Sequence, residues 1–208
     1  MGTTSGVTRA TFLHVASVTR HRDLKSELIR WLCDDKNGFF PECMQWQHDI
    51  HFTKTAPMNT MASNIGGQTI HQFSKSGIDL VTGLQSGGKK DSELSENLVH
   101  TKIQQMRWLI IDEIENVSVE LLDAVNRQVI DSTRAVGNPW ARDTRDPKRI
   151  AIFGGLNLLL LGDLWQIPPV RSLSIADNPF LQRSANSSRI LEMFWTKDLP
   201  HSLTHRFV

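Results

Sequence analysis

The stretch that most constrains the fold is a short apolar run that ends in two acids. Residues 108–113 read WLIIDE. A continuous apolar run of this length is typical of a strand that is buried on both faces, as in a parallel sheet. Open α/β sheets bind ligands at the carboxyl ends of their strands, so we expect Asp112 and Glu113 at such an edge. The alternative is a buried strand that ends in a solvated turn.

Two acids at that edge have a defined chemical use. One carboxylate can hold Mg²⁺ on a nucleotide, and a second can orient or deprotonate an attacking water. This arrangement is that of a Walker B motif. A second apolar run, residues 156–161, also ends in an acid, Asp163, and continues as LWQIPPV over residues 164–170. The sequence therefore predicts two neighbouring buried strands with acids at their ends.

These segments resemble one helicase family. GDLWQIPPV, residues 162–170, resembles the GDxxQLPPV motif III of superfamily-one helicases, and residues 55–71 resemble motif Ia and its sequel, TAPTxxAAxxIGGxTIH. With the Walker B pair between them, the blocks stand in the order of the PIF-like (petite-integration-frequency) 5′-to-3′ DNA helicases, which include the Helitron-type enzymes. The resemblance runs from about Phe52 to the C-terminus.

The resemblance implies an α/β fold, namely a RecA-like P-loop NTPase domain with a parallel sheet. That domain would occupy residues 51–208, after a poorly assigned segment of residues 1–50. The implied function is that of an ATP-dependent DNA helicase, with Mg²⁺ and ATP as cofactors. In such an enzyme Asp112 would hold Mg²⁺, Glu113 would act on the attacking water, and Gln166 would sense the γ-phosphate; all three would contact the nucleotide.

The resemblance also implies a track for single-stranded DNA that leads to a duplex junction. Loops with small polar side chains suit phosphate contact, and an aromatic face can stack on a base. The alternative for Trp165 is packing in the core. The alternative for His71 is a buried histidine whose hydrogen bonds are satisfied. The residues expected at the DNA are Pro57, Asn59, Thr69, His71, Trp165 and Pro168.

The sequence departs from the family pattern in three ways. It contains no GxxxxGK[ST] phosphate loop. Glu115-Asn116 replaces the usual Ser-Met after the DEI triplet, and no second RecA-like domain follows. We therefore expect an incomplete ATPase core. Two alternatives are a catalytically dead, transposon-derived nucleic-acid-binding remnant and a RecD-like helicase subunit, although the block at residues 55–71 argues against the second.

Composition limits the classes of protein to which the chain can belong. The 208 residues suit one α/β domain, and the net charge of +1 supplies no global signal for nucleic acid. No run of 18 apolar residues and no secretory signal occurs, so we expect no membrane partner. Residues 1–22 contain no acid, which is compatible with a mitochondrial transit peptide or with an ordinary exposed segment. We expect a nuclear or mitochondrial protein; the sequence leaves its oligomeric state open.

Further elements follow from local patterns. Apolar spacing predicts a surface helix over residues 23–32 and another that begins after an N-cap at Ser118. Residues 51–56 are expected to form a strand, and residues 77–96 and 137–149 surface loops. Two cysteines and two histidines have a spacing that fits no common zinc finger; they are Cys33, Cys43, His48 and His51.

Overall fold

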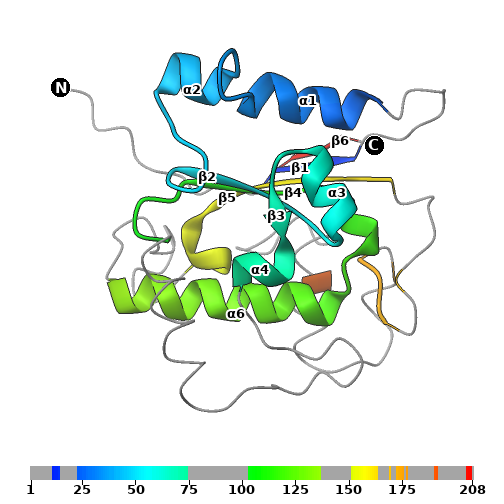
Figure 1. The fold of residues 1–208 in the computed structure, drawn as a ribbon. Coiled ribbons are helices and arrows are strands. Elements are labelled where there is room, and N and C mark those ends of the chain that lie inside the picture. The colour runs from blue at the N-terminus through cyan, green and yellow to red at the C-terminus, as the bar shows by residue number, and fades with distance from the viewer. Residues whose placement is uncertain are drawn as a thin grey trace.

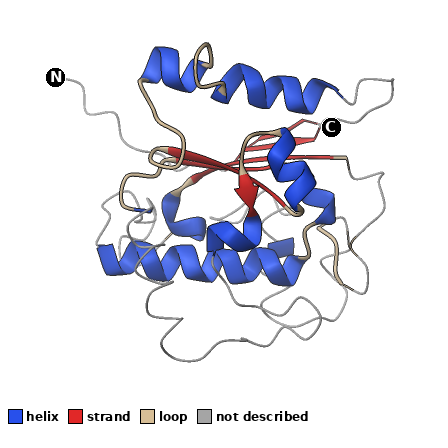
Figure 2. Ribbon diagram, viewed as in Figure 1, coloured by secondary structure: helices blue, strands red, loops and turns tan. Residues whose placement is uncertain are grey.

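A computed structural model describes residues 11–14, 23–74, 103–136, 151–163, 169, 172–175, 177, 190–191 and 205–207. These residues form three layers, with a central sheet between two layers of helices (Figures 1 and 2). Helices α1 (Asp23–Cys33) and α2 (Phe39–Met44) cover one face of the sheet, and α4 (Ile70–Ser74) and α6 (Val119–Val136) cover the other. The short helix α3 (Asn59–Asn64) precedes the edge strand β3.

In the described part of the chain, the sheet has six strands in the order β3-β2-β4-β5-β1-β6. Every neighbouring pair is parallel. This confirms the expected α/β fold with a parallel sheet. The strands are β1 (Thr11–His14), β2 (Phe52–Ala56), β3 (Gln68–Thr69), β4 (Trp108–Ile111), β5 (Asn157–Gly162) and β6 (His205–Phe207).

Strand β4 is buried on both faces, as its apolar run predicts. Leu109 and Ile111 belong to the core cluster that includes α6, whereas Ile110 belongs to the cluster beneath α1 and α2. Successive side chains of a strand point to opposite faces, so one run supplies both cores. The neighbouring strand β5 divides in the same way, with Leu158 on the α6 side and Leu159 on the α1 side.

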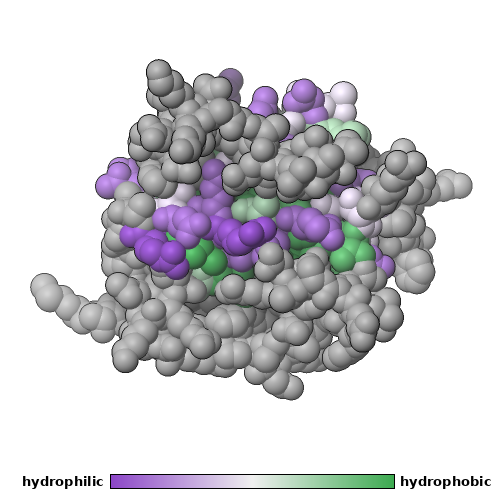
Figure 3. All heavy atoms as spheres, turned by 90° about the horizontal axis from the view of Figure 1, so that it is seen from below, coloured by the Kyte–Doolittle hydropathy of each residue, from purple (hydrophilic) through white to green (hydrophobic). Residues whose placement is uncertain are grey.

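Helix α6 connects the parallel strands β4 and β5 and forms a βαβ unit with them. Its start is capped as expected, because the Ser118 hydroxyl accepts a hydrogen bond from the Leu121 N–H at 3.1 Å. Seen from below, the described surface carries a band of hydrophilic residues (Figure 3). Over residues 119–134, where burial is described, the exposed side chains of α6 are charged, as an amphipathic helix requires; they are Glu120, Arg127, Asp131 and Arg134.

Within residues 1–50, which the sequence leaves poorly assigned, the described residues 11–14 and 23–50 contribute to the same layers. Strand β1 lies between β5 and β6, and α1 confirms the helix predicted over residues 23–32. The expected loops at residues 77–96 and 137–149 lie outside the described residues. None of the helices in the described ranges is both long and apolar enough to cross a membrane.

Candidate nucleotide-binding site

Asp112 stands at the carboxyl edge of the sheet, directly after β4. Its backbone N–H donates to the Thr55 carbonyl at 2.9 Å, which continues the pairing with β2 for one residue. Its Oδ1 accepts a hydrogen bond from the Glu113 N–H at 3.0 Å. The residue is 4% exposed. Asp112 is therefore held rigidly at the edge where a parallel sheet presents its ligands.

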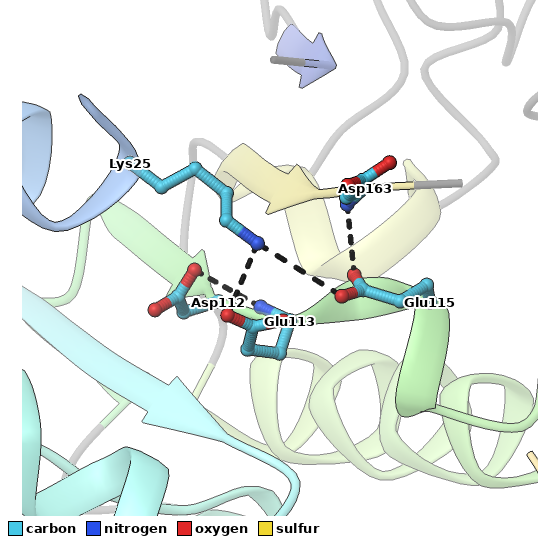
Figure 4. A network of polar contacts seen from close by, with 5 residues as sticks. All are labelled: Lys25, Asp112, Glu113, Glu115 and Asp163. Atoms are coloured by element: carbon cyan, nitrogen blue, oxygen red, sulfur yellow. Dashed lines mark hydrogen bonds and ion pairs between the residues drawn. The ribbon is translucent and has the colours of Figure 1, made fainter. Parts of the chain in front are cut away.

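Glu113 occupies an unusual backbone conformation. Its φ of 52° and ψ of 47° lie in the left-handed region, which costs free energy for any residue other than glycine. This turn separates β4 from the 3₁₀ helix η1 (Ile114–Asn116) and sends the Glu113 side chain towards α1. The Glu113 carboxylate accepts a hydrogen bond from Lys25 Nζ at 3.0 Å (Figure 4). Glu113 therefore combines a strained backbone conformation with a defined contact between its side chain and Lys25.

Lys25 is a site residue that the sequence motifs did not reveal. It lies in the first turn of α1, the helix that follows β1, and its side chain is 9% exposed. A buried ammonium at the start of such a helix suits a phosphate, because helix N-termini attract anions. The signal in the sequence is the Lys25-Ser26 pair, which corresponds to the end of a GK[ST] signature. It was missed because residues 7–37 contain no glycine.

Glu115 is a third acid at the site and is 1% exposed. Its Oε2 accepts a hydrogen bond from the Asp163 N–H at 3.1 Å, and its Oε1 lies 3.9 Å from Lys25 Nζ. Gly162 makes room for this side chain, because a Cβ at that position would lie 2.3 Å from Glu115 Oε2. The ends of β4 and β5 and the start of α1 are therefore joined through one polar network (Figure 4).

The three acids have different proton affinities. Burial and the contact with Glu113 raise the pKa of Glu115 to about 8. Burial also pushes the pKa of Glu113 upwards, but the neighbouring Glu115 side chain and the hydrogen bond from Lys25 outweigh it and bring this pKa below its ordinary value. Burial, reinforced by the Glu113 charge, raises the pKa of Asp112 to about 6. Within the network, Lys25 therefore favours the ionised form of Glu113, whereas burial favours the protonated form of Glu115.

The side chains at this site supply some, but not all, of the contacts that a magnesium-bound phosphate needs. Mg²⁺ on a nucleotide commonly uses one or two carboxylates, several waters and the phosphates themselves, so Asp112 suffices as a protein ligand. In keeping with this, no cluster of three or more His, Cys, Asp or Glu among the described residues is arranged to hold a metal alone. Lys25 is suitably charged for a phosphate. The segment between β1 and α1 lacks the glycines with which a phosphate loop wraps its ligand.

Two of the residues expected at DNA lie on an accessible part of the same edge. Pro57 follows β2 directly and is half-buried, and Asn59 is exposed at the start of α3. Both therefore stay available to a nucleic-acid backbone. Their contact with DNA remains a prediction.

Two other residues of this set, Thr69 and His71, are less exposed than Asn59. The Thr69 hydroxyl accepts the Gln72 N–H at 3.1 Å, and the Thr69 N–H donates to Gln72 Oε1 at 2.9 Å. This reciprocal pair is a capping box at the start of α4. The His71 Nε2 atom is buried and has no hydrogen-bond partner among the described residues, and burial lowers the pKa of this imidazole. His71 is thus neutral and half-buried.

The glycines beside Thr69 are explained by packing. Gly66 has a φ of 60°, and a Cβ on Gly67 would lie 2.4 Å from the Lys54 carbonyl oxygen. The two glycines therefore let this segment of the chain approach strand β2 closely. Three residues with predicted roles, Trp165, Gln166 and Pro168, lie outside the described residues.

A parallel sheet with a lysine and acids at its carboxyl edge is the arrangement of the P-loop-like class of α/β domains. Comparison with known proteins narrows this class. The model of the PIF1-like helicase family matches residues 47–198, and the chain belongs to that family. The expected RecD-like alternative is not favoured, because the matching family and relatives are PIF1-like.

Curated relatives match a shorter stretch. The chain is similar to the ATP-dependent DNA helicase PIF1 of Saccharomyces cerevisiae, with 33% identity over 56% of this chain and 12% of the relative. It is 34% identical to the ATP-dependent DNA helicase RRM3 of the same species, over 56% of this chain and 14% of that protein. The chain therefore spans only about an eighth of the length of these relatives.

Solved structures support the fold. The crystal structure of Pif1 helicase from Candida albicans matches with a TM-score of 0.54 and 23% identity, over 98% of this chain and 36% of that chain. The structure of Bacteroides sp. Pif1 in complex with ADP-AlF4 matches with a TM-score of 0.50 and 20% identity, over 91% of this chain and 34% of that chain. At these identities the structures establish similarity of fold.

Proposed function

We propose that this chain forms part of the ATPase core of a DNA helicase and binds the phosphates of Mg·ATP at the carboxyl edge of its sheet. The observation that supports this is the ion pair between Lys25 and Glu113, at 3.0 Å across 88 residues of sequence. It places a cation beside the two acids of the Walker B pair. Those acids are the groups that the family resemblance assigns to magnesium and water.

Each residue has a defined part in this proposal. Lys25 binds a phosphate oxygen as a point charge, and Asp112 holds Mg²⁺. Glu113, once Lys25 has turned to the phosphate, is free to accept a proton from the attacking water. Gln166 is proposed as the sensor of the γ-phosphate, because a neutral amide can donate to a phosphate oxygen and accept from water. Bound Mg²⁺ supplies charge neutralisation at the transferring phosphate.

DNA is the proposed macromolecular partner. Relatives named ATP-dependent DNA helicase and the exposed Asn59 beside the half-buried Pro57 support this. We propose that single-stranded DNA passes these residues, with Thr69, His71, Trp165 and Pro168 along the same track towards the duplex junction. DNA repair, recombination and telomere maintenance, in the nucleus or the mitochondrion, are the proposed settings. The alternative is a transposon-derived remnant that binds nucleic acid but does not catalyse ATP hydrolysis.

Nucleotide binding by the 208-residue chain tests the proposal. Isothermal titration calorimetry with Mg·ATP is expected to show weak binding, because no glycine lies between β1 and α1. Lys25→Ala is expected to reduce that binding by tenfold or more, since a hydrogen bond to a charged group contributes about 1.5–3 kcal/mol. The matched control is Lys36→Ala, which removes an exposed lysine from the turn between α1 and α2. Equal affinities in the two variants, or no binding at all, contradict the proposal.

A further inference from the structure

Two stacked aromatic side chains are exposed on the helical layer that covers one face of the sheet. Helices α1 and α2 form that layer (Figure 1). Trp31, in the last turn of α1, is 61% exposed, and Phe39, at the start of α2, is 38% exposed. Their ring centroids lie 5.8 Å apart, with an interplanar angle of 19°. Single exposed apolar residues are common, whereas two rings stacked across two helices form a defined surface, which we call the aromatic patch.

The aromatic patch is fixed to the core beneath it. The Phe39 ring centroid lies 6.2 Å from that of Phe40, which is 4% exposed. Phe40 in turn packs against Trp46, Phe52 and Trp108, with ring-centroid distances of 5.3, 5.2 and 5.6 Å. The exposed rings are therefore ordered before any partner binds. A surface that is ordered in advance loses little conformational entropy on association.

The turn between α1 and α2 holds the two exposed rings together. The Gly38 N–H donates to the Asp34 carbonyl oxygen at 2.9 Å, and a Cβ on Gly38 would lie 2.4 Å from the Asp34 nitrogen. The Asp34 carboxylate accepts hydrogen bonds from the N–H groups of Lys36 and Asn37, at 3.1 and 2.9 Å. Glycine at position 38 thus permits a close turn, which brings the start of α2 beside the last turn of α1.

The charged groups around the aromatic patch are mainly acidic. Over residues 25–44, the side chains that are at least partly exposed include four acids and two bases, a net charge of −2 in a chain whose net charge is +1. One ion pair, between Glu27 and Arg30, neutralises one acid and one base. Such surroundings attract cations and repel polyanions. The acids are Glu27, Asp34, Asp35 and Glu42, and the bases are Arg30 and Lys36.

These charges distinguish between possible occupants of the aromatic patch. Nucleic acid carries a negative charge on every phosphate, so the acids oppose its approach. A second copy of the chain, in a two-fold dimer, would place the same acidic surroundings against each other. An arginine side chain suits both features of the surface, because its guanidinium group stacks on aromatic faces and pairs with carboxylates.

We propose that the aromatic patch is a docking surface for a basic amphipathic segment of a partner protein. An arginine of that segment stacks on Trp31 and is attracted by the surrounding acids, while aliphatic side chains of the segment cover Phe39. Aromatic anchors of this kind commonly dominate the binding free energy of an interface. The inference goes beyond the proposed function and does not depend on it, because Trp31 is exposed whereas Lys25, on the same helix, is buried at the candidate nucleotide site.

A model peptide tests the proposal on the full 208-residue chain. The probe is a helical peptide of about 16 residues made of leucine, arginine and alanine, with leucines on one side and arginines on the other. Proton–nitrogen NMR follows the Trp31 indole N–H, which is assigned as the signal that is lost in Trp31→Phe. We expect the peptide to shift this signal until it saturates. A Trp31 signal that stays unchanged at every peptide concentration overturns the proposal.

Substitutions on and off the aromatic patch compare affinities for the same peptide. Trp31→Ala is expected to weaken binding by about tenfold or more, as at an anchor of an interface. The matched control is Met58→Ala, which removes a side chain that is 52% exposed and follows the end of β2. It should leave the affinity unchanged. Equal affinities of Trp31→Ala and the wild type contradict the docking role.

A second pair of variants tests the charge around the aromatic patch. Asp35→Lys combined with Glu42→Lys is expected to weaken peptide binding, whereas Glu120→Lys, on the exposed side of α6, should not. A peptide with lysine in place of arginine should bind the wild type more weakly, because an ammonium group lacks the planar face that stacks on an indole. If Trp31→Ala fails to fold, the double variant decides, since both of its side chains are exposed. An unchanged affinity in that variant overturns the proposal.

Two further measurements test the other occupants. Addition of oligothymidylate should leave the Trp31 indole signal in place, and self-association in sedimentation velocity should not depend on Trp31. A shift with oligothymidylate but none with the peptide assigns the aromatic patch to nucleic acid. Self-association that Trp31→Ala abolishes assigns it to a second copy of the chain. Either result overturns the proposal.

Discussion

Lys25 Nζ lies 3.0 Å from Glu113 Oε1, and this contact joins the first turn of α1 to the end of β4. The two residues are 88 positions apart in the sequence. Their side chains are 9% and 20% exposed, so water screens the pair weakly. The contact both stabilises the fold and brings a cation to the acids of the candidate site.

Loss of the Lys25 charge is expected to destabilise the chain. Lys25→Met keeps the length of the aliphatic stem but leaves Glu113 without its cation, and breaking a buried ion pair costs about 3–5 kcal/mol. The partial exposure of Glu113 places the expectation at the lower end of that range. Urea unfolding at pH 7 measures the change, and Lys36→Met should stay within about 0.5 kcal/mol of the wild type. A loss of the same size in both variants contradicts the structural role of the pair.

Gly162 and Glu115 are expected to be coupled. Gly162→Ala introduces a methyl group 2.3 Å from Glu115 Oε2 and 2.6 Å from Ile114 Cγ2, so it should cost about 1–3 kcal/mol of stability by overpacking. Part of that cost should disappear in a Glu115→Ala background, where the carboxyl group is absent. A double-mutant cycle measures the coupling. The pair Gly162→Ala with Glu120→Ala should be additive, because Glu120 is exposed on α6.

Stability is expected to fall as pH rises from about 4.5 to about 8. The folded chain holds a proton on Glu115 up to a pKa of about 8, whereas the ordinary value is 4.5, so in this window the unfolded chain binds fewer protons. The contribution of Glu115 is therefore fully present below pH 4.5 and is lost as pH rises through 8. Asp112 adds a smaller effect of the same sign up to about pH 6. Glu115→Gln should flatten the profile of the unfolding free energy.

Catalysis is expected to depend on the Walker B pair in a chimaera that adds a glycine-rich phosphate loop and a second RecA-like domain from a PIF1-like relative. The 208-residue chain alone should hydrolyse ATP negligibly. In the chimaera, Glu113→Gln should lower turnover by about 10²–10⁴-fold while Mg·ATP stays bound, because shape is kept and the base is lost. Asp112→Ala should instead weaken magnesium-dependent binding. Unchanged hydrolysis in Glu113→Gln excludes the assigned role.

The two loops proposed to lie at DNA should respond differently to mutation. Thr69→Ala is expected to lower stability by about 1 kcal/mol, since it removes the N-cap of α4, whereas Thr69→Ser keeps the cap. Asn59→Ala should leave stability unchanged and weaken binding of fluorescent single-stranded DNA. Thermal melting and fluorescence anisotropy on the same samples make the comparison. Equal DNA affinity in Asn59→Ala and wild type removes Asn59 from the track.

The sequence by itself determined that the fold is an α/β fold with a parallel sheet. It also located two of the acids at the carboxyl edge of that sheet. The apolar runs at residues 108–111 and 156–161 become β4 and β5, and Ser118 caps α6, because each of these features is encoded by a local pattern. Asp112 and Glu113 follow directly, since the residue after a parallel strand lies at its carboxyl edge. The family motifs also depend on contiguous residues and needed no coordinates.

Only the tertiary structure decided how distant segments meet. Strand β1 has four residues and no distinctive pattern, yet it lies between β5 and β6. Lys25 was not expected in the site, because the glycines that announce a phosphate loop are missing and its contact spans 88 residues. Glu115 was visible only as a departure from a motif; its partners at Asp163 and Lys25 depend on packing. Local propensity acts over a few residues, whereas the free energy of buried charges is determined by whichever groups the packed sheet brings together.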